Sequence, residues 1–192
     1  MLDRAVHEVA LAEEPVAAAH RISREQDAEG SGEPLTWRSL RLETMACMLV
    51  MTLRRRGDRF FEAQCQWPRL HPLNERATAV SHHPLIIVES TRQLATAVQN
   101  RYLRPGQEPL LEAVSVNLGL HAGTQPIESG SATRVSVRVM LSDLVLQAGA
   151  LASFRVTAEY LHAGQPFATC AIRFASAPAE TGAAGGSDWP TF

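Results

Sequence analysis

Residues 84–98 read PLIIVESTRQLATAV, and they predict one long helix that continues to about Leu103. Pro84 suits the first helical position, because the N–H that proline lacks has no partner inside a helix there. Pro105 and Gly106 follow the stretch and end it. The predicted helix therefore has roughly five turns.

The polar and apolar side chains of this helix separate into two stripes. Spacings of three and four residues place Glu89, Arg92, Gln93, Thr96 and Asn100 on one stripe, and Ile87, Thr91, Leu94, Val98 and Tyr102 on the other. Two interpretations remain open. The polar stripe can face water, with Glu89 and Arg92 as a surface ion pair worth roughly a few tenths of a kcal/mol. Alternatively it is partly desolvated, which would make Glu89 a better base.

Segments with strand patterns lie on both sides of the helix. They cover residues 46–53 and 59–66, which flank a turn at 55–58, and then residues 111–121, 132–146, 151–162 and 166–175. We expect a bend near Ser142 and Asp143, and a tight hairpin turn at residues 163–165. This order predicts an α+β protein and favours the hotdog fold, an antiparallel sheet wrapped around one long central helix. Other α+β folds with one helix also fit the pattern.

The chain has the size and composition of one globular domain, with 192 residues, 45% hydrophobic and 20% charged. We expect an N-terminal arm at residues 1–36, the folded domain at 37–175 and a loose tail at 176–192, where Ala, Gly, Pro and Ser dominate. The acidic N-terminus does not resemble a signal peptide, and no apolar run is long enough to span a bilayer. We therefore predict a cytoplasmic protein without a membrane partner.

Composition excludes several classes of chemistry. All 18 basic residues are arginine, so Schiff-base chemistry, lysine-bound pyridoxal phosphate and a P-loop are excluded. A net charge of −2 disfavours nucleic-acid binding. Cys47, Cys65 and Cys170 lie far apart, which predicts reduced thiols, and the pair His82 and His83 has no third ligand at a suitable spacing. We predict no metal and no cofactor.

Two stretches carry a resemblance to a known family. Residues 61–72 read FEAQCQWPRLHP, and residues 83–93 read HPLIIVESTRQ. Both resemble the A-factor biosynthesis hotdog (AfsA-type) domain, whose second motif is His-Pro-Leu, a short apolar run and then Glu-x-x-Arg-Gln. The resemblance extends from about Trp37 to Ala175.

The resemblance implies an acyltransferase. Such an enzyme joins a β-ketoacyl group, carried as a thioester on acyl carrier protein, to a hydroxyl of dihydroxyacetone phosphate on the way to a γ-butyrolactone signal. An acyl-CoA thioester is the alternative donor. Typical synthases of this family carry two hotdog domains, whereas this chain has room for one, so the resemblance implies a homodimer.

The resemblance also implies site residues. Glu89 would act as general base on the acceptor hydroxyl, and Arg92 would pair with a phosphate or with Glu89. His71 is similarly placed to the catalytic histidine of hotdog dehydratases, although a structural loop histidine is the simpler interpretation. His83, Gln93 and Thr96 are candidate substrate contacts, with helix capping as the alternative for His83.

Four arginines surround the predicted hairpin turn, namely Arg54, Arg55, Arg56 and Arg59. Such a run is typical of a solvated turn, but it is also a candidate docking site for an acidic carrier protein. Two other functions remain open. The same scaffold could serve a dehydratase, hydratase or thioesterase, because fold does not settle the reaction. It could also serve as a non-catalytic protein that binds an acyl chain or a lactone.

Overall fold

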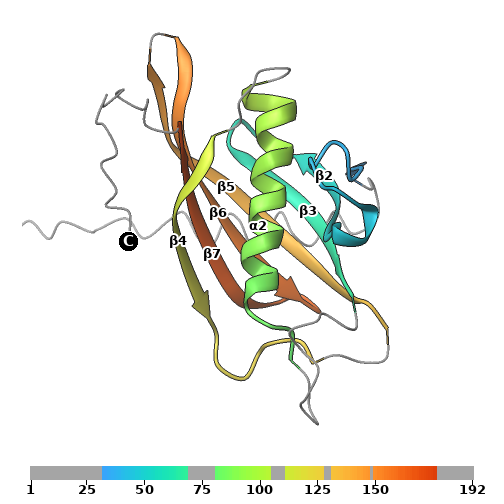
Figure 1. Cartoon of the computed structure of the whole chain (residues 1–192). Coiled ribbons are helices and arrows are strands. Elements are labelled where there is room, and N and C mark those ends of the chain that lie inside the picture. The colour runs from blue at the N-terminus through green and yellow to red at the C-terminus, as the bar shows by residue number, and fades with distance from the viewer. Residues whose placement is uncertain (1–31, 69–80, 105–110, 128–130, 148, 177–192) are drawn as a thin grey trace, which may run out of the picture. The chain divides into compact units, whose positions relative to one another are not determined.

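A computed structural model of the chain describes residues 32–68, 81–104, 111–127, 131–147 and 149–176. These residues belong to a compact unit that begins at Gly32. Within them, seven strands form one antiparallel sheet in the order β1-β2-β3-β5-β6-β7-β4 (Figure 1). The strands are β1 (Glu33–Pro34), β2 (Val50–Arg55), β3 (Phe60–Trp67), β4 (Glu112–Leu120), β5 (Thr133–Gln147), β6 (Ala150–His162) and β7 (Gln165–Ala175).

The predicted long helix lies across one face of this sheet. It consists of α2 (Leu85–Val98) and continues without a break as the π-helical turn η2 (Gln99–Leu103). Helix α2 contacts β2, β3, β4, β6 and β7, so the sheet curves around it (Figure 1). The α+β class and the hotdog arrangement predicted from the order of the elements are therefore confirmed.

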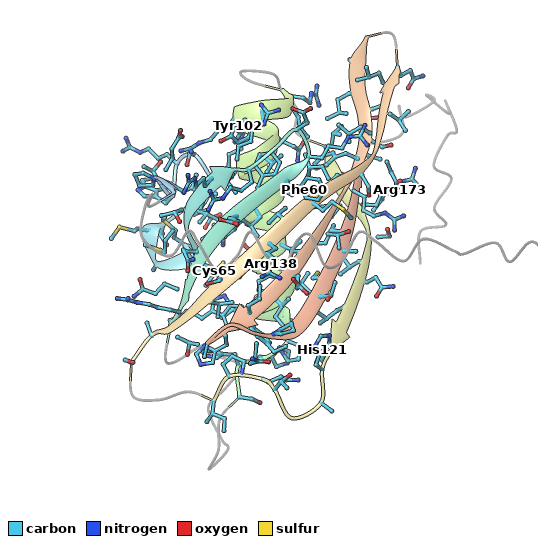
Figure 2. The ribbon with its side chains drawn as sticks, turned by 180° about the vertical axis from the view of Figure 1, so that it is seen from behind. Phe60, Cys65, Tyr102, His121, Arg138 and Arg173 are labelled. Carbon is cyan, nitrogen blue, oxygen red and sulfur yellow. The ribbon has the colours of Figure 1, made fainter. Side chains whose placement is uncertain are left out.

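Strand β3 illustrates how alternation in the sequence builds the core. Its inward side chains Phe61, Ala63, Cys65 and Trp67 are buried, and the residues between them are exposed. An alternation with a period of two is expected for a strand that has one face on the core and the other in water. Figure 2 shows the opposite, outer face of the sheet, where Phe60 is labelled and is 56% exposed.

The structure corrects the expected start of the first hairpin strand. The sequence predicts a strand from Ala46, but residues 45–47 form the short 3-10 helix η1 (Met45–Cys47), and β2 begins only at Val50. The amides of Leu49 and Val50 donate to the side chain of Gln93 on α2. The ladder between β2 and β3 begins at Val50, and the segment before it is held by the Gln93 side chain. The structure also places β1 in the sheet, upstream of the expected domain start at residue 37.

The bend expected near Ser142 and Asp143 and the tight turn expected at residues 163–165 are both present. The ladder between β5 and β6 shifts register between Ser142 and Val145, and Asp143 has a φ of 51°. The turn between β6 and β7 consists of Ala163 and Gly164, both with positive φ, and it joins the paired residues His162 and Gln165. Two consecutive positive φ angles give the twist that a two-residue hairpin needs.

Helices of the described residues do not meet the length and apolarity that a bilayer crossing requires.

Candidate active site

The helix begins beside two histidines with different surroundings. The Nδ1 atom of His83 accepts a hydrogen bond from the Leu85 N–H at 3.2 Å, which caps the start of α2. His82 is 4% exposed, its Nε2 atom lies 2.7 Å from the hydroxyl of Thr133, and its ring packs edge-on against Trp67. His83 thus serves the helix start. The candidate His71 lies outside the described residues.

Glu89 and Arg92 form a two-pronged ion pair on one side of the helix. Arg92 donates from Nε to Glu89 Oε2 at 2.8 Å and from Nη2 to Oε1 at 2.7 Å. These hydrogen bonds raise the pKa of the guanidinium above its usual value, against the effect of partial burial. The side chains are 39% (Glu89) and 43% (Arg92) exposed. The pair is therefore neither fully hydrated nor sealed from water.

Gln93 attaches this pair to the body of the protein. Its Nε2 atom donates to Glu89 Oε1 at 3.0 Å and to the carbonyl of Cys47 at 2.8 Å. Its Oε1 atom accepts from the amides of Leu49 at 2.9 Å and Val50 at 3.3 Å. An amide side chain has two donor hydrogens and two acceptor lone pairs, and all four are used here. Gln93 is completely buried, so protein groups occupy its entire hydrogen-bonding capacity.

Both interpretations of the polar stripe need revision. Gln93 and Thr96 are buried, whereas Glu89 and Arg92 keep about two-fifths of their side-chain surface. The hydroxyl of Thr96 donates to the carbonyl of Arg92 at 3.0 Å, a bond within the helix. The polar stripe therefore contains both the buried side chain of Gln93 and, one helical turn away, the partly exposed carboxylate of Glu89.

A second polar cluster, which the sequence did not reveal, lies on the opposite side of the same turns. Trp67 donates from Nε1 to the hydroxyl of Ser90 at 3.0 Å. The hydroxyls of Thr91 and Tyr160 lie 2.7 Å apart, and both reach the carbonyl of Ile87. Burial raises the pKa of Tyr160 well above its usual value. Thr91 has the spacing of the apolar stripe, but its partner comes from β6, which no sequence pattern connects to it.

Comparison with known proteins identifies the family of this chain. The family model of the A-factor biosynthesis hotdog domain (AfsA) matches residues 42–177, which is more than half of the chain. The chain belongs to this family. The resemblance seen in the two sequence motifs is thereby confirmed, and Glu89, Arg92 and Gln93 all lie within the matched part of this AfsA-type domain.

Solved structures add a likeness of fold. A thioesterase from Haemophilus influenzae superposes with a TM-score of 0.50 at 11% sequence identity, covering 74% of this chain and 91% of that one. The dehydratase heterocomplex ApeI:P from Xenorhabdus doucetiae gives a TM-score of 0.49 at 10% identity, with coverage of 71% and 88%. A search of curated proteins returned no match. At these identities the likeness to the thioesterase concerns the fold alone.

The arginine-rich turn of the AfsA-type domain is partly neutralised. Arg55 pairs with Asp58 at 3.3 Å, and Arg56 pairs with Glu62 at 2.7 Å. Arg59 is exposed. Two of the four candidate docking arginines thus have a carboxylate partner within the hairpin itself, and an acidic carrier protein would compete with these partners.

Proposed function

We propose that this protein transfers an acyl group from a thioester to a hydroxyl of a small phosphorylated alcohol, with Glu89 as the general base. The family supports an acyl-thioester substrate, because the domain is named for A-factor biosynthesis and the motif Glu-x-x-Arg-Gln is complete. The observation that carries the proposal is the geometry of one carboxylate, partly exposed and held by Arg92 and Gln93.

Binding of the acceptor would release this carboxylate. Both oxygens of Glu89 accept hydrogen bonds from Arg92, so in this state Arg92 stands where an acceptor hydroxyl would have to approach. The planar guanidinium suits a phosphate as well as it suits a carboxylate. An acceptor phosphate would therefore take over Arg92 and free Oε2, while Gln93 keeps Oε1 in position.

The proposed reaction conserves every proton and electron pair. Glu89 removes the proton of the acceptor hydroxyl, whose oxygen attacks the carbonyl carbon of the thioester. The tetrahedral intermediate then collapses, the bond between carbon and sulfur breaks, and the thiolate leaves. The thiolate takes the proton back from Glu89, so the products are an ester and a thiol and the carboxylate is regenerated.

In this proposal Gln93 is a positioning residue and not a substrate contact. Its four hydrogen bonds go to protein atoms, so contact with substrate would first require one of them to break. His83 and Thr96 remain proposed substrate contacts, although each already makes a hydrogen bond with the helix backbone. His71 remains a prediction.

Product analysis with and without the acceptor tests the proposed reaction. A β-ketoacyl thioester is incubated with the protein, alone or together with dihydroxyacetone phosphate, and the thiol and ester products are quantified. We expect ester only when both substrates are present. Thiol release without the acceptor would contradict transfer and favour hydrolysis, and saturable binding without any product would favour a non-catalytic acyl-binding protein.

We further propose a homodimer, because strand β4 leaves one edge of the sheet open. Within the described residues β4 pairs only with β7, and its side chains Val114, Val116 and Leu120 are 39–56% exposed. An open edge with apolar side chains is a template for pairing with another strand. Sedimentation analysis should give a dimer for the native chain and a monomer for Val116→Arg.

The proposed carrier-protein contact is the arginine-rich turn. Arg59 is the member to substitute first, because it is exposed and its removal leaves the ion pairs of Arg55 and Arg56 intact. We expect Arg59→Gln to weaken carrier binding by about threefold at low salt, and added salt to remove the difference. The matched control is Arg173→Gln, an exposed arginine on the outer face of the sheet (Figure 2). An equal loss in both variants would contradict docking at the turn.

A further inference from the structure

A groove of about 810 Å³ lies beside η1 and the start of β2, separate from the Glu89 ion pair. Four segments line it: residues 35–38, part of residues 45–51, the end of β3 and Ala132 just before β5. The larger apolar side chains of the lining are Leu35, Trp37, Met45, Met48, Met51 and Pro68. Pockets for small organic ligands have volumes of roughly 300–1,000 Å³ and mostly apolar walls, so this groove has the size and lining of a ligand site.

Two methionines of the groove expose much of their apolar surface to water. Met45 is 72% exposed and Met51 is 36% exposed, and both side chains line the same hollow. Methionine is flexible and polarisable, and it suits surfaces that adapt to an apolar chain. Trp37 adds a partly exposed aromatic face beside them. An apolar ligand would remove this surface from water, which is favourable by the hydrophobic effect.

One cation marks the rim of the groove. Arg38 is exposed, and its guanidinium carbon lies 5.0 Å from the centre of the Trp37 ring. In the part of the chain that the structure describes, Arg38 makes no ion pair with an acid. A guanidinium held on an aromatic face can still donate from its edge to a carboxylate. Among the residues that the structure describes, the groove thus combines an apolar floor with one positive charge.

We infer that this groove binds an unbranched carboxylic acid, with the alkyl chain on the methionines and the carboxylate at Arg38. The charge and the apolar surface are complementary to the two ends of such a molecule. The site shares η1 with the proposed active site, because the Cys47 carbonyl accepts from Gln93 while Ala46 and Met48 on either side of it line the groove. Binding itself requires no turnover at Glu89.

Quenching of tryptophan fluorescence by bromine-tagged decanoic acid tests the inference in a Trp189→Phe background. Of the two tryptophans that remain, Trp37 lines the groove and Trp67 is buried in the core. We expect saturable quenching with the full chain. Met45→Glu places a charged carboxylate where the alkyl chain of the acid would lie, and it should weaken binding by at least about tenfold. The matched control Met140→Glu changes a methionine that is 41% exposed on β5, and its affinity should be unchanged. Circular dichroism checks the fold of each variant.

The role of Arg38 is tested with the acid and its methyl ester. Arg38→Gln should weaken binding of the acid by about threefold, as expected for an exposed charge pair, and leave binding of the ester unchanged. Equal affinities of Met45→Glu and Met140→Glu for the acid would overturn the site. The site would also be overturned if the native chain shows no quenching and Met45→Glu converts a dimer to a monomer, because the groove would then be a subunit interface. Glu89→Gln should bind the acid normally, which separates this inference from the proposed reaction.

Discussion

Two sides of the same helical turns differ in how firmly their polar groups are held. On the inner side, Ser90 and Thr91 are completely buried, and their hydroxyls bond to Trp67 and Tyr160 from the sheet. On the outer side, Glu89 and Arg92 bond mainly to each other and keep about two-fifths of their surface. A buried hydroxyl that loses its partner stays unsatisfied, whereas an exposed group can turn to water or substrate.

The difference is consistent with a structural role for the inner side and with the proposed chemical role for the outer side. Removing a partner from a buried polar group costs about 1–3 kcal/mol, whereas a partly exposed ion pair contributes about 1 kcal/mol or less. In the proposed reaction, exchange of Arg92 between Glu89 and a ligand would therefore cost little free energy. The inner contacts would keep the helix in place during this exchange. Gln93 shares features of both sides, because it is buried and donates to Glu89.

Glu89→Gln should produce the largest effect, and it should fall on activity alone. Loss of the general base should lower turnover of the thioester and acceptor by about 100-fold to 10,000-fold. The unfolding free energy should change by less than about 1 kcal/mol, because the side chain is partly exposed. Turnover by the acyl-transfer assay and urea unfolding measure the two effects. Unchanged turnover would remove Glu89 from the mechanism.

Gln93→Met should destabilise the protein by about 3 kcal/mol. The substitution leaves the amides of Leu49 and Val50 and the carbonyl of Cys47 without their buried partner. Urea unfolding measures the loss. The control Thr96→Val removes only a bond within the helix and should cost less than half as much. Equal losses would mean that Gln93 does not anchor the helix to β2.

Tyr160→Phe should lower the unfolding free energy by about 1–2 kcal/mol and leave turnover within about twofold. The variant removes the phenol that contacts Thr91 and the Ile87 carbonyl and keeps the ring. The matched control is Tyr102→Phe, at a partly buried ring near the helix end, which should be nearly neutral. A large drop in turnover for Tyr160→Phe would contradict a purely structural role for the inner side of the helix.

Alkaline pH should lower the free energy of unfolding by about 1 kcal/mol through the buried thiol of Cys65. Burial raises the pKa of Cys65 from 9.0 to about 12, so the folded state keeps a proton that the unfolded state releases. Stability from this thiol is complete below pH 9 and is lost as the pH rises toward 12. Urea unfolding at about pH 8 and pH 10 should show a smaller loss for Cys65→Ala than for the native chain. Equal losses would exclude Cys65 as the source.

Particular elements explain why the fold was predictable and the site only in part. The helix and the four strands after it have regular hydrophobic periods, and the turn at Ala163 and Gly164 has suitable residues, so local patterns sufficed. The strand prediction was wrong from Ala46 to Leu49, where the carbonyl of Cys47 accepts a hydrogen bond from a side chain 46 residues away. The partner of Thr91 lies 69 residues away on β6. Contacts of this range leave no period in the sequence.

The amino-acid order alone determined the α+β class with one long helix, the family motif and the position of Glu89 one turn before Gln93. It favoured the sheet wrapped around the helix over other α+β folds but did not exclude them. Periodicity and motif spacing are local properties, and local backbone geometry turns them directly into helix and strand. The burial of Gln93, the partial exposure of Glu89 and Arg92, and the groove beside Arg38 came only with the folded chain. Burial depends on which distant segments cover a side chain, and only the three-dimensional packing brings those segments together.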